Sequence, residues 1–146
     1  MVWTLVFCAA ATTAPNPSAQ LSPQQVVEAQ LKPLAHNDTP TEDAGIAAAF
    51  RFASPENKKV TGPLKKFIGI VRSEAYAPMI DHVRFEVGEP RITGDRAAVP
   101  VRLFAANGRK YGYVFLLGRQ NDGQYAGCWM TDGVQLFADE PAGVEL

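Results

Sequence analysis

An acid and two tyrosines in the C-terminal third are the residues of this sequence best suited to catalysis. The acid is Asp132, and the tyrosines are Tyr111 and Tyr113, which lie in an apolar segment earlier in the sequence. A carboxylate whose pKa is raised by burial, placed beside a tyrosine hydroxyl, can abstract a proton next to a carbonyl. Asp81 is a further candidate at the start of the predicted sheet. We favour the simpler interpretation, in which Asp132 and Gly133 form a bend and the tyrosines pack in the core, so no catalytic residue is predicted.

The sequence offers few other groups for catalysis or metal binding. It has no glycine-rich phosphate loop, no pairing of zinc ligands and no Gly-x-Ser-x-Gly motif. His82 alternates with apolar residues and is expected on the polar face of a strand, and His36 is expected in an exposed turn. Cys128 lies in an apolar segment and is expected to be a buried hydrophobic residue. We therefore expect no metal and no cofactor.

Four lysines form the one cluster of like charge. Lys58, Lys59, Lys65 and Lys66 lie close together in a segment with helical periodicity. The favoured interpretation is a solvated helix face. The alternative is a docking patch for an acidic partner or a membrane surface.

Composition and charge indicate a globular protein with a single core. The chain has 146 residues, of which 47% are hydrophobic and 20% charged. Its formal net charge is -1, which predicts no general attraction to nucleic acid or to anionic lipid. We predict one α+β domain over residues 21–137, preceded by an apolar leader and spacer in residues 1–20 and followed by a loose tail in residues 138–146.

The leader predicts export or import into an organelle. Residues 1–20 carry no charge, and residues 2–11 form an apolar run that ends in the small residues Ala9, Ala10 and Ala11. The run is well short of the roughly 18 residues that span a bilayer. The alternative is that it forms a buried N-terminal segment of the mature protein.

The first half of the domain predicts helices. Ser22, Pro23 and Gln25 are typical of a capping box at the start of a first helix, which ends before residues 37–40. A second helix is expected from Thr41 to about Ala53, a short turn over residues 55–58, and a third helix from residues 61–63 onwards.

The second half predicts antiparallel strands, because the apolar period changes from 3.6 to 2 after His82. Residues 111–117 are apolar at both odd and even positions, so this strand should be central and covered on both faces. Pro100 cannot donate a hydrogen bond to a neighbouring strand, so it predicts a bulge or an edge position. Helices followed by such a sheet predict an α+β fold in which a curved sheet packs on the helices.

Several short motifs resemble those of the domain of unknown function 4864 family. They are residues 50–55 (FRFASP), residues 61–63 (TGP), Arg119-Gln120 and residues 127–130 (GCWM). The resemblance covers roughly residues 23–134. It implies no established activity. The order of elements also resembles the nuclear transport factor 2-like superfamily, which implies a conical α+β fold with three helices and a curved sheet of four or more strands.

The resemblance leaves two functions open. The first is a non-catalytic interaction domain, such as an accessory subunit of a larger, membrane-associated assembly. The alternative is a small-molecule carrier, or a lyase or isomerase like ketosteroid isomerase and scytalone dehydratase, which resemble this fold but whose catalytic sets are not found here. Residues 127–132 resemble the branch of the family from photosynthetic eukaryotes, which implies the thylakoid lumen of a plastid as the location.

Overall fold

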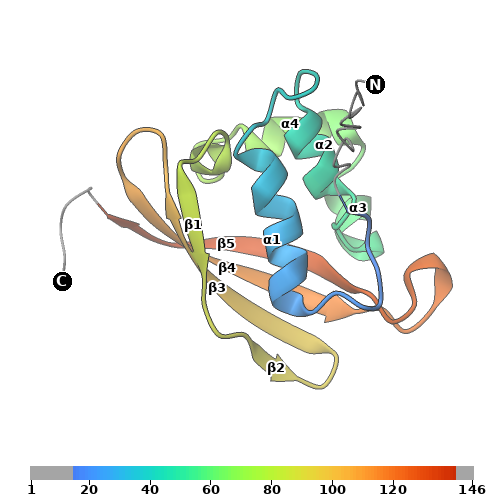
Figure 1. Cartoon of the computed structure of the whole chain (residues 1–146). Coiled ribbons are helices and arrows are strands. Elements are labelled where there is room, and N and C mark those ends of the chain that lie inside the picture. Colours follow the sequence, from blue (N-terminus) through green and yellow to red (C-terminus); the bar gives the residue numbers. More distant parts are fainter. Residues whose placement is uncertain (1–14, 141–146) are drawn as a thin grey trace, which may run out of the picture.

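Four helices precede a five-stranded antiparallel sheet in the computed structural model, which describes residues 15–140 and the side chains as far as Phe137 (Figure 1). The predicted α+β class is therefore confirmed. The helices are α1 (Pro23–Leu34), α2 (Ala44–Phe50), α3 (Pro55–Thr61) and α4 (Leu64–Val71). The strands are β1 (Arg84–Val87), β2 (Arg91–Thr93), β3 (Arg96–Phe104), β4 (Lys110–Arg119) and β5 (Trp129–Glu140). Two short 3-10 helices, η1 (Ala77–Met79) and η2 (Gly123–Tyr125), join these elements.

Helix α1 forms as its sequence predicts. Ser22 accepts a hydrogen bond from the backbone N–H of Gln25, whose side chain accepts one from the backbone N–H of Ser22. This capping box satisfies amides that the first turn leaves without partners. The buried stripe of the helix consists of Val26, Val27, Ala29, Gln30, Leu31 and Leu34.

The other helices differ from the prediction in two places. Helix α2 begins at Ala44 rather than Thr41, because Asp43 adopts a left-handed conformation with φ 58°. The segment predicted as a turn at residues 55–58 is part of helix α3. Ser54 caps this helix by accepting from the N–H of Asn57, and Pro55 occupies the first helical position.

Strand β4 is central, as predicted, because it pairs with β3 on one side and β5 on the other. Strands β1 and β2 both pair with β3 along its other edge, where a gap separates them. Pro100 is opposite this gap and accepts a hydrogen bond from the N–H of Gly88. Its missing N–H is thus accommodated by a break between two short strands, although β3 itself is an internal strand.

The core lies between the helices and one face of the sheet, which we call the helix side. The inward residues of β3 and β4 alternate with outward ones, as the burial pattern of both strands shows. The inward set consists of Ala97, Val99, Val101, Leu103, Tyr111, Tyr113, Phe115 and Leu117. These side chains pack with Val26, Val27 and Leu31 of α1 in one hydrophobic cluster. Side chains therefore fill the space that a conical fold could leave as a cavity.

The prediction for His82 was wrong, because its side chain is 4% exposed. The strand begins only at Arg84, and Asp81 before it has a left-handed φ of 55°. The turn at Asp81 breaks the alternation that placed His82 on the polar face. The ring Nδ1 donates to the carbonyl of Met79 at 2.8 Å, and Val83 is the residue that faces solvent. Cys128 is buried, as predicted.

Among residues 15–140, none of the helices has the length and apolar character needed to cross a membrane. The apolar run of residues 2–11 lies outside the described residues.

Candidate functional site

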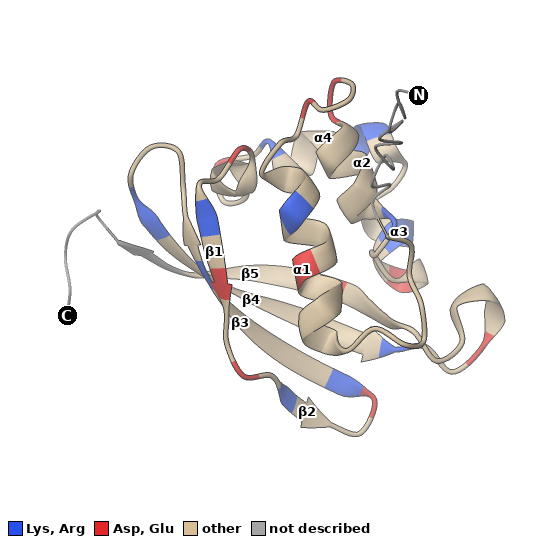
Figure 2. Cartoon of the chain, in the orientation of Figure 1, with Lys and Arg blue, Asp and Glu red and all other residues tan. Residues whose placement is uncertain are grey.

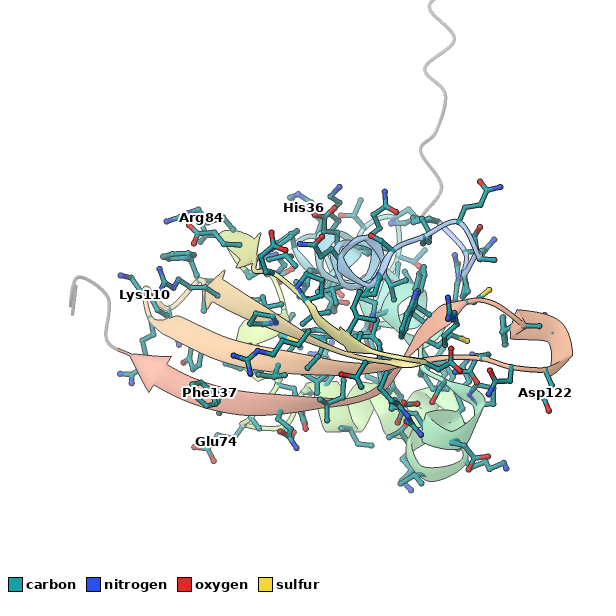
Figure 3. The ribbon with its side chains drawn as sticks, turned by 90° about the horizontal axis from the view of Figure 1, so that it is seen from below. His36, Glu74, Arg84, Lys110, Asp122 and Phe137 are labelled. Atoms are coloured by element: carbon teal, nitrogen blue, oxygen red, sulfur yellow. The ribbon has the colours of Figure 1, made fainter. Side chains whose placement is uncertain are left out.

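The face of the sheet opposite the helices carries an apolar band that no described residue covers. We call this surface the open face. Pro100 of β3 is paired with Val114 of β4, and Ala98 is paired with Leu116. Leu116 is 37% exposed. Figure 3 shows the strands with α1, seen end-on, to one side of them. The sequence predicted that both faces of β4 are covered. Among the described residues, the helix side of β4 is covered and the open face is not.

The open face continues onto β5 through Phe137. This residue is an extra one in the β5 register, because Leu136 pairs with Tyr113 and Ala138 with Gly112. Such a bulge redirects the side chain that it contains. Phe137 is 81% exposed, the highest value among the large hydrophobic residues described.

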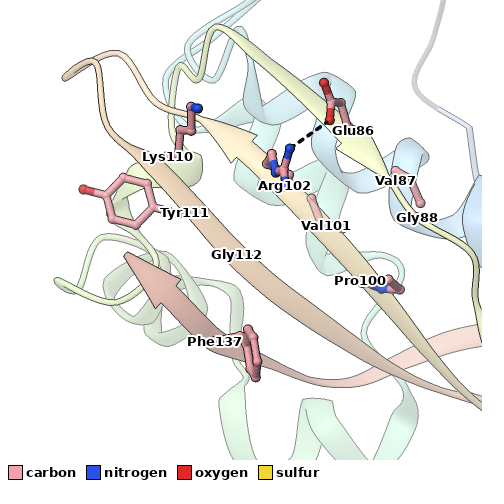
Figure 4. A pocket seen from close by; sticks show the side chains of 10 residues that line it. All are labelled: Glu86, Val87, Gly88, Pro100, Val101, Arg102, Lys110, Tyr111, Gly112 and Phe137. Carbon is pink, nitrogen blue, oxygen red and sulfur yellow. Dashed lines mark ion pairs between the residues drawn. The ribbon is translucent and has the colours of Figure 1, made fainter. Parts of the chain in front are cut away.

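Phe137 forms one wall of a hollow of about 480 Å³ in the open face (Figure 4). Gly112 lies beside it on β4 and contributes no side chain. We call this feature the Gly112 hollow. Pro100 and Arg102 of β3 line its other side, with Glu86 of β1 beyond them, and Lys110 lies at one end.

Among the described residues that line the Gly112 hollow, Arg102 and Lys110 are positive and Glu86 is negative. Figure 2 colours the Lys and Arg positions of the strands blue and the Asp and Glu positions red. Arg84 and Glu86 form an ion pair with a distance of 2.8 Å, and the guanidinium of Arg84 stacks on the ring of Phe104 at 3.5 Å. Arg102 reaches the same carboxylate only at 3.9 Å. Lys110 forms no ion pair with any described side chain. One acid is therefore shared by two arginines, and a lysine adds a further positive charge.

A second hollow, of about 710 Å³, lies at the opposite end of the sheet between α3, the turn before β3 and the loop after β4. Its lining is mainly polar and includes Asp132. Two ion pairs fix its charged groups: Arg96 with Asp132 at 2.9 Å, and Arg119 with Asp95 at 2.9 Å. The charged side chains thus largely satisfy one another.

Asp132 and the two tyrosines lie on opposite sides of the sheet. Tyr111 and Tyr113 are buried on the helix side. Leu117 faces the helix side, so the next residue, Gly118, faces the open face. A Cβ added to Gly118 would lie 2.7 Å from a carboxylate oxygen of Asp132. Asp132 is therefore on the open face, and the acid and tyrosine do not meet.

The contacts of the tyrosines and of Asp81 are structural. The Tyr113 hydroxyl donates to the carbonyl of Ala75 at 2.7 Å, and the Tyr111 hydroxyl accepts from the Asn107 amide at 2.9 Å. The Asp81 carboxylate accepts from the backbone N–H of Asn37 at 3.0 Å and joins the end of α1 to the turn before β1. Within the described residues, His, Cys, Asp and Glu form no group of three that could hold a metal ion.

Lysines of the predicted cluster make separate contacts with residues near them in the structure. Lys59 forms an ion pair with Glu56 at 2.9 Å, and Lys66 donates to the carbonyl of Val60 at 2.7 Å. The ammonium of Lys58 lies over the rings of Phe50 and Tyr125, at 5.5 and 5.2 Å, and burial lowers its pKa. Lys65 is exposed. The four lysines do not act as one uniform patch.

The sequence contained a signal for the apolar residues of β4 on the open face but none for the exposure of Phe137. Apolar residues at both odd and even positions of 111–117 indicated that something contacts each face of β4. The exposure of Phe137 had no such signal, because simple alternation cannot locate a bulge.

Comparison with known proteins gives a match to a family model. The model, described as a domain of unknown function (DUF4864), matches residues 17–144 and so spans the helices and the whole sheet. No curated protein and no solved structure matches the chain.

Proposed function

Since the chain belongs to the DUF4864 family, a family of unknown function, we propose its role from its geometry: it is a non-catalytic interaction domain that binds a partner protein through the open face. The partner contributes an apolar surface that covers Leu116, Val114 and Pro100. It belongs to a larger assembly in an exported or organellar compartment, a location that rests on the apolar leader in residues 1–20.

One observation carries the proposal, namely the apolar band on the solvent side of a central strand. An antiparallel sheet with one face in water normally carries polar residues on that face. Here β4 has Val114 and Leu116 at its outward positions, and Phe137 extends the apolar surface to β5. Contiguous exposed apolar surface of this kind marks sites of interaction. The centre of a protein interface is apolar and depleted of charge, as this band is.

The alternative functions have less support. A lyase or isomerase mechanism needs the acid near a tyrosine, whereas Asp132 and Tyr113 lie on opposite sides of the sheet. A carrier needs an enclosed cavity, whereas the helix side is filled by buried side chains such as Tyr113, Leu31 and Ile46.

Purification from native cells with two matched variants tests the proposal. Leu116→Glu places a charge in the centre of the open face. Ile92→Glu changes another exposed hydrophobic residue, on β2. Ile92 pairs with Ala97, which faces the helix side, so Ile92 is also on the helix side. We expect the wild type and Ile92→Glu to copurify with the same partner protein, and Leu116→Glu to lose it.

Thermal unfolding of each variant serves as the control for folding, because Leu116 is only 37% exposed and loss of the partner counts only if Leu116→Glu is folded. Recovery of the wild type only as a free monomer, or equal partner recovery with both variants, would contradict the proposal.

A further inference from the structure

We propose that the partner segment carries a carboxylate next to an aromatic or aliphatic side chain, and that the Gly112 hollow receives both groups. This inference rests on the proposed function and adds the chemistry of the partner. It comes from the Gly112 hollow rather than from the central apolar band.

The shape of the hollow suits a side chain laid flat against Phe137. Gly112 contributes no side chain to the surface of β4, and it lies between Phe137 on β5 and Arg102, its pairing partner on β3 (Figure 4). The hollow has a volume of about 480 Å³ and is open to solvent, so a side chain of a partner can enter it. An aromatic or aliphatic group placed here would cover the Phe137 ring, which is 81% exposed, and aromatic residues are common anchors in interfaces.

The positive charges at the edge of the hollow favour a partner segment with a carboxylate next to its aromatic or aliphatic side chain. Arg102 has a planar guanidinium with five donors. Its contact to one Glu86 oxygen is long at 3.9 Å, whereas Arg84 holds the other oxygen at 2.8 Å. Arg102 can therefore offer a bidentate contact to a second carboxylate. Lys110 at the end of the hollow adds a positive charge, and its ammonium lies over the ring of Phe104 at 5.8 Å and forms no ion pair with a described side chain.

Other partner chemistries fit less well. A purely apolar segment would remove Arg102 and Lys110 from water without a compensating charge, which is costly. A basic segment would meet two positive groups, so the edge charges also select against it. An acidic and apolar segment satisfies both parts of the hollow.

Selection from a displayed library of random short peptides tests this inference without knowledge of the natural partner. The wild-type protein should enrich peptides in which Asp or Glu is adjacent to an aromatic or aliphatic residue. The binding of a selected peptide should weaken as salt is added, since ion pairs at an exposed edge are screened. Reversal of both charges, Arg102→Glu with Lys110→Glu, should weaken that peptide by roughly tenfold or more, equivalent to about 1.4 kcal/mol.

Lys65→Glu is the matched control, because Lys65 is an exposed cation on α4 away from the open face. Unchanged binding by this variant is expected, and loss of binding would instead assign the acid to the lysine cluster and overturn the inference. A single Arg102→Gln change keeps the test informative if the double variant does not fold. Enrichment of peptides without acidic residues would also overturn the inference.

The two proposals fail in different ways. If Leu116→Glu abolishes peptide binding while the charge variants leave it unchanged, the open face binds a partner but the inferred chemistry is wrong. If the wild type selects no peptide, the result counts against both.

Discussion

At the scale of single residues, Tyr113 stabilises the fold through its hydroxyl. The residue is 1% exposed, and its hydroxyl donates to the Ala75 carbonyl at 2.7 Å. We expect Tyr113→Phe to lower the free energy of unfolding by about 1 kcal/mol, because the half-buried Ala75 carbonyl loses its donor. Tyr111→Phe should cost less, because its hydroxyl accepts from Asn107 in an exposed turn. Urea denaturation of both variants checks this, and equal losses would be inconsistent with it.

His82 gives the fold a dependence on pH. Burial lowers the pKa of its imidazole from the ordinary value of about 6.5, although the Met79 carbonyl opposes this shift. The unfolded chain therefore binds a proton at a higher pH than the folded chain. The free energy of unfolding should fall as the pH drops below about 6.5, and the loss should be complete below the folded pKa.

Denaturation of the wild type and of His82→Asn between about pH 8 and pH 5 tests this dependence. His82→Asn should remove the part of the slope that His82 contributes. A slope that is the same in His82→Asn and the wild type would show that other groups cause the pH dependence.

At the scale of elements, the close contact between α1 and α2 requires a glycine. A Cβ on Gly45 would lie 2.4 Å from the carbonyl oxygen of Pro33 and 2.9 Å from the Cα of Asn37. Both are backbone atoms, so the helices would have to separate. We expect Gly45→Ala to lower the free energy of unfolding by roughly 2 kcal/mol or more.

Gly69 provides the matched control in α4, because nothing lies within 4 Å of an added Cβ there. Gly69→Ala should raise stability by about 0.5 to 1 kcal/mol through its helix propensity. Thermal or urea unfolding measures both changes. Similar effects of the two substitutions would contradict the proposed contact.

Elements with strong local signals could be predicted, and those that depend on tertiary contacts could not. The capping residues Ser22 and Gln25 predicted the start of α1, and alternation predicted the buried residues of β3. Helix α3 buries none of its residues and has no apolar stripe to reveal it. It is held by Ser54, whose backbone N–H donates to Thr131 of β5, a contact between residues far apart in sequence.

At the scale of the whole molecule, the helices cover one face of the sheet and leave the other without a cover among the described residues. The sequence predicted an occupant for each face of β4 from its doubly apolar pattern. It could not predict the Gly112 hollow, because Glu86, Arg102, Gly112 and Phe137 come from four strands whose register is set by pairing and by the bulge at Phe137. The candidate site is thus a product of the assembled sheet.

Photo-crosslinking in native cells tests the central claim most directly. A photoreactive amino acid would replace Leu116 on the open face, and in a second variant it would replace Ile92 on the helix side. Both positions are solvent-exposed, so a nonspecific reaction should label neighbours from either one. The account predicts a discrete crosslinked partner from position 116 and none from position 92. The same partner from both positions, or no protein crosslinked from position 116, would contradict it.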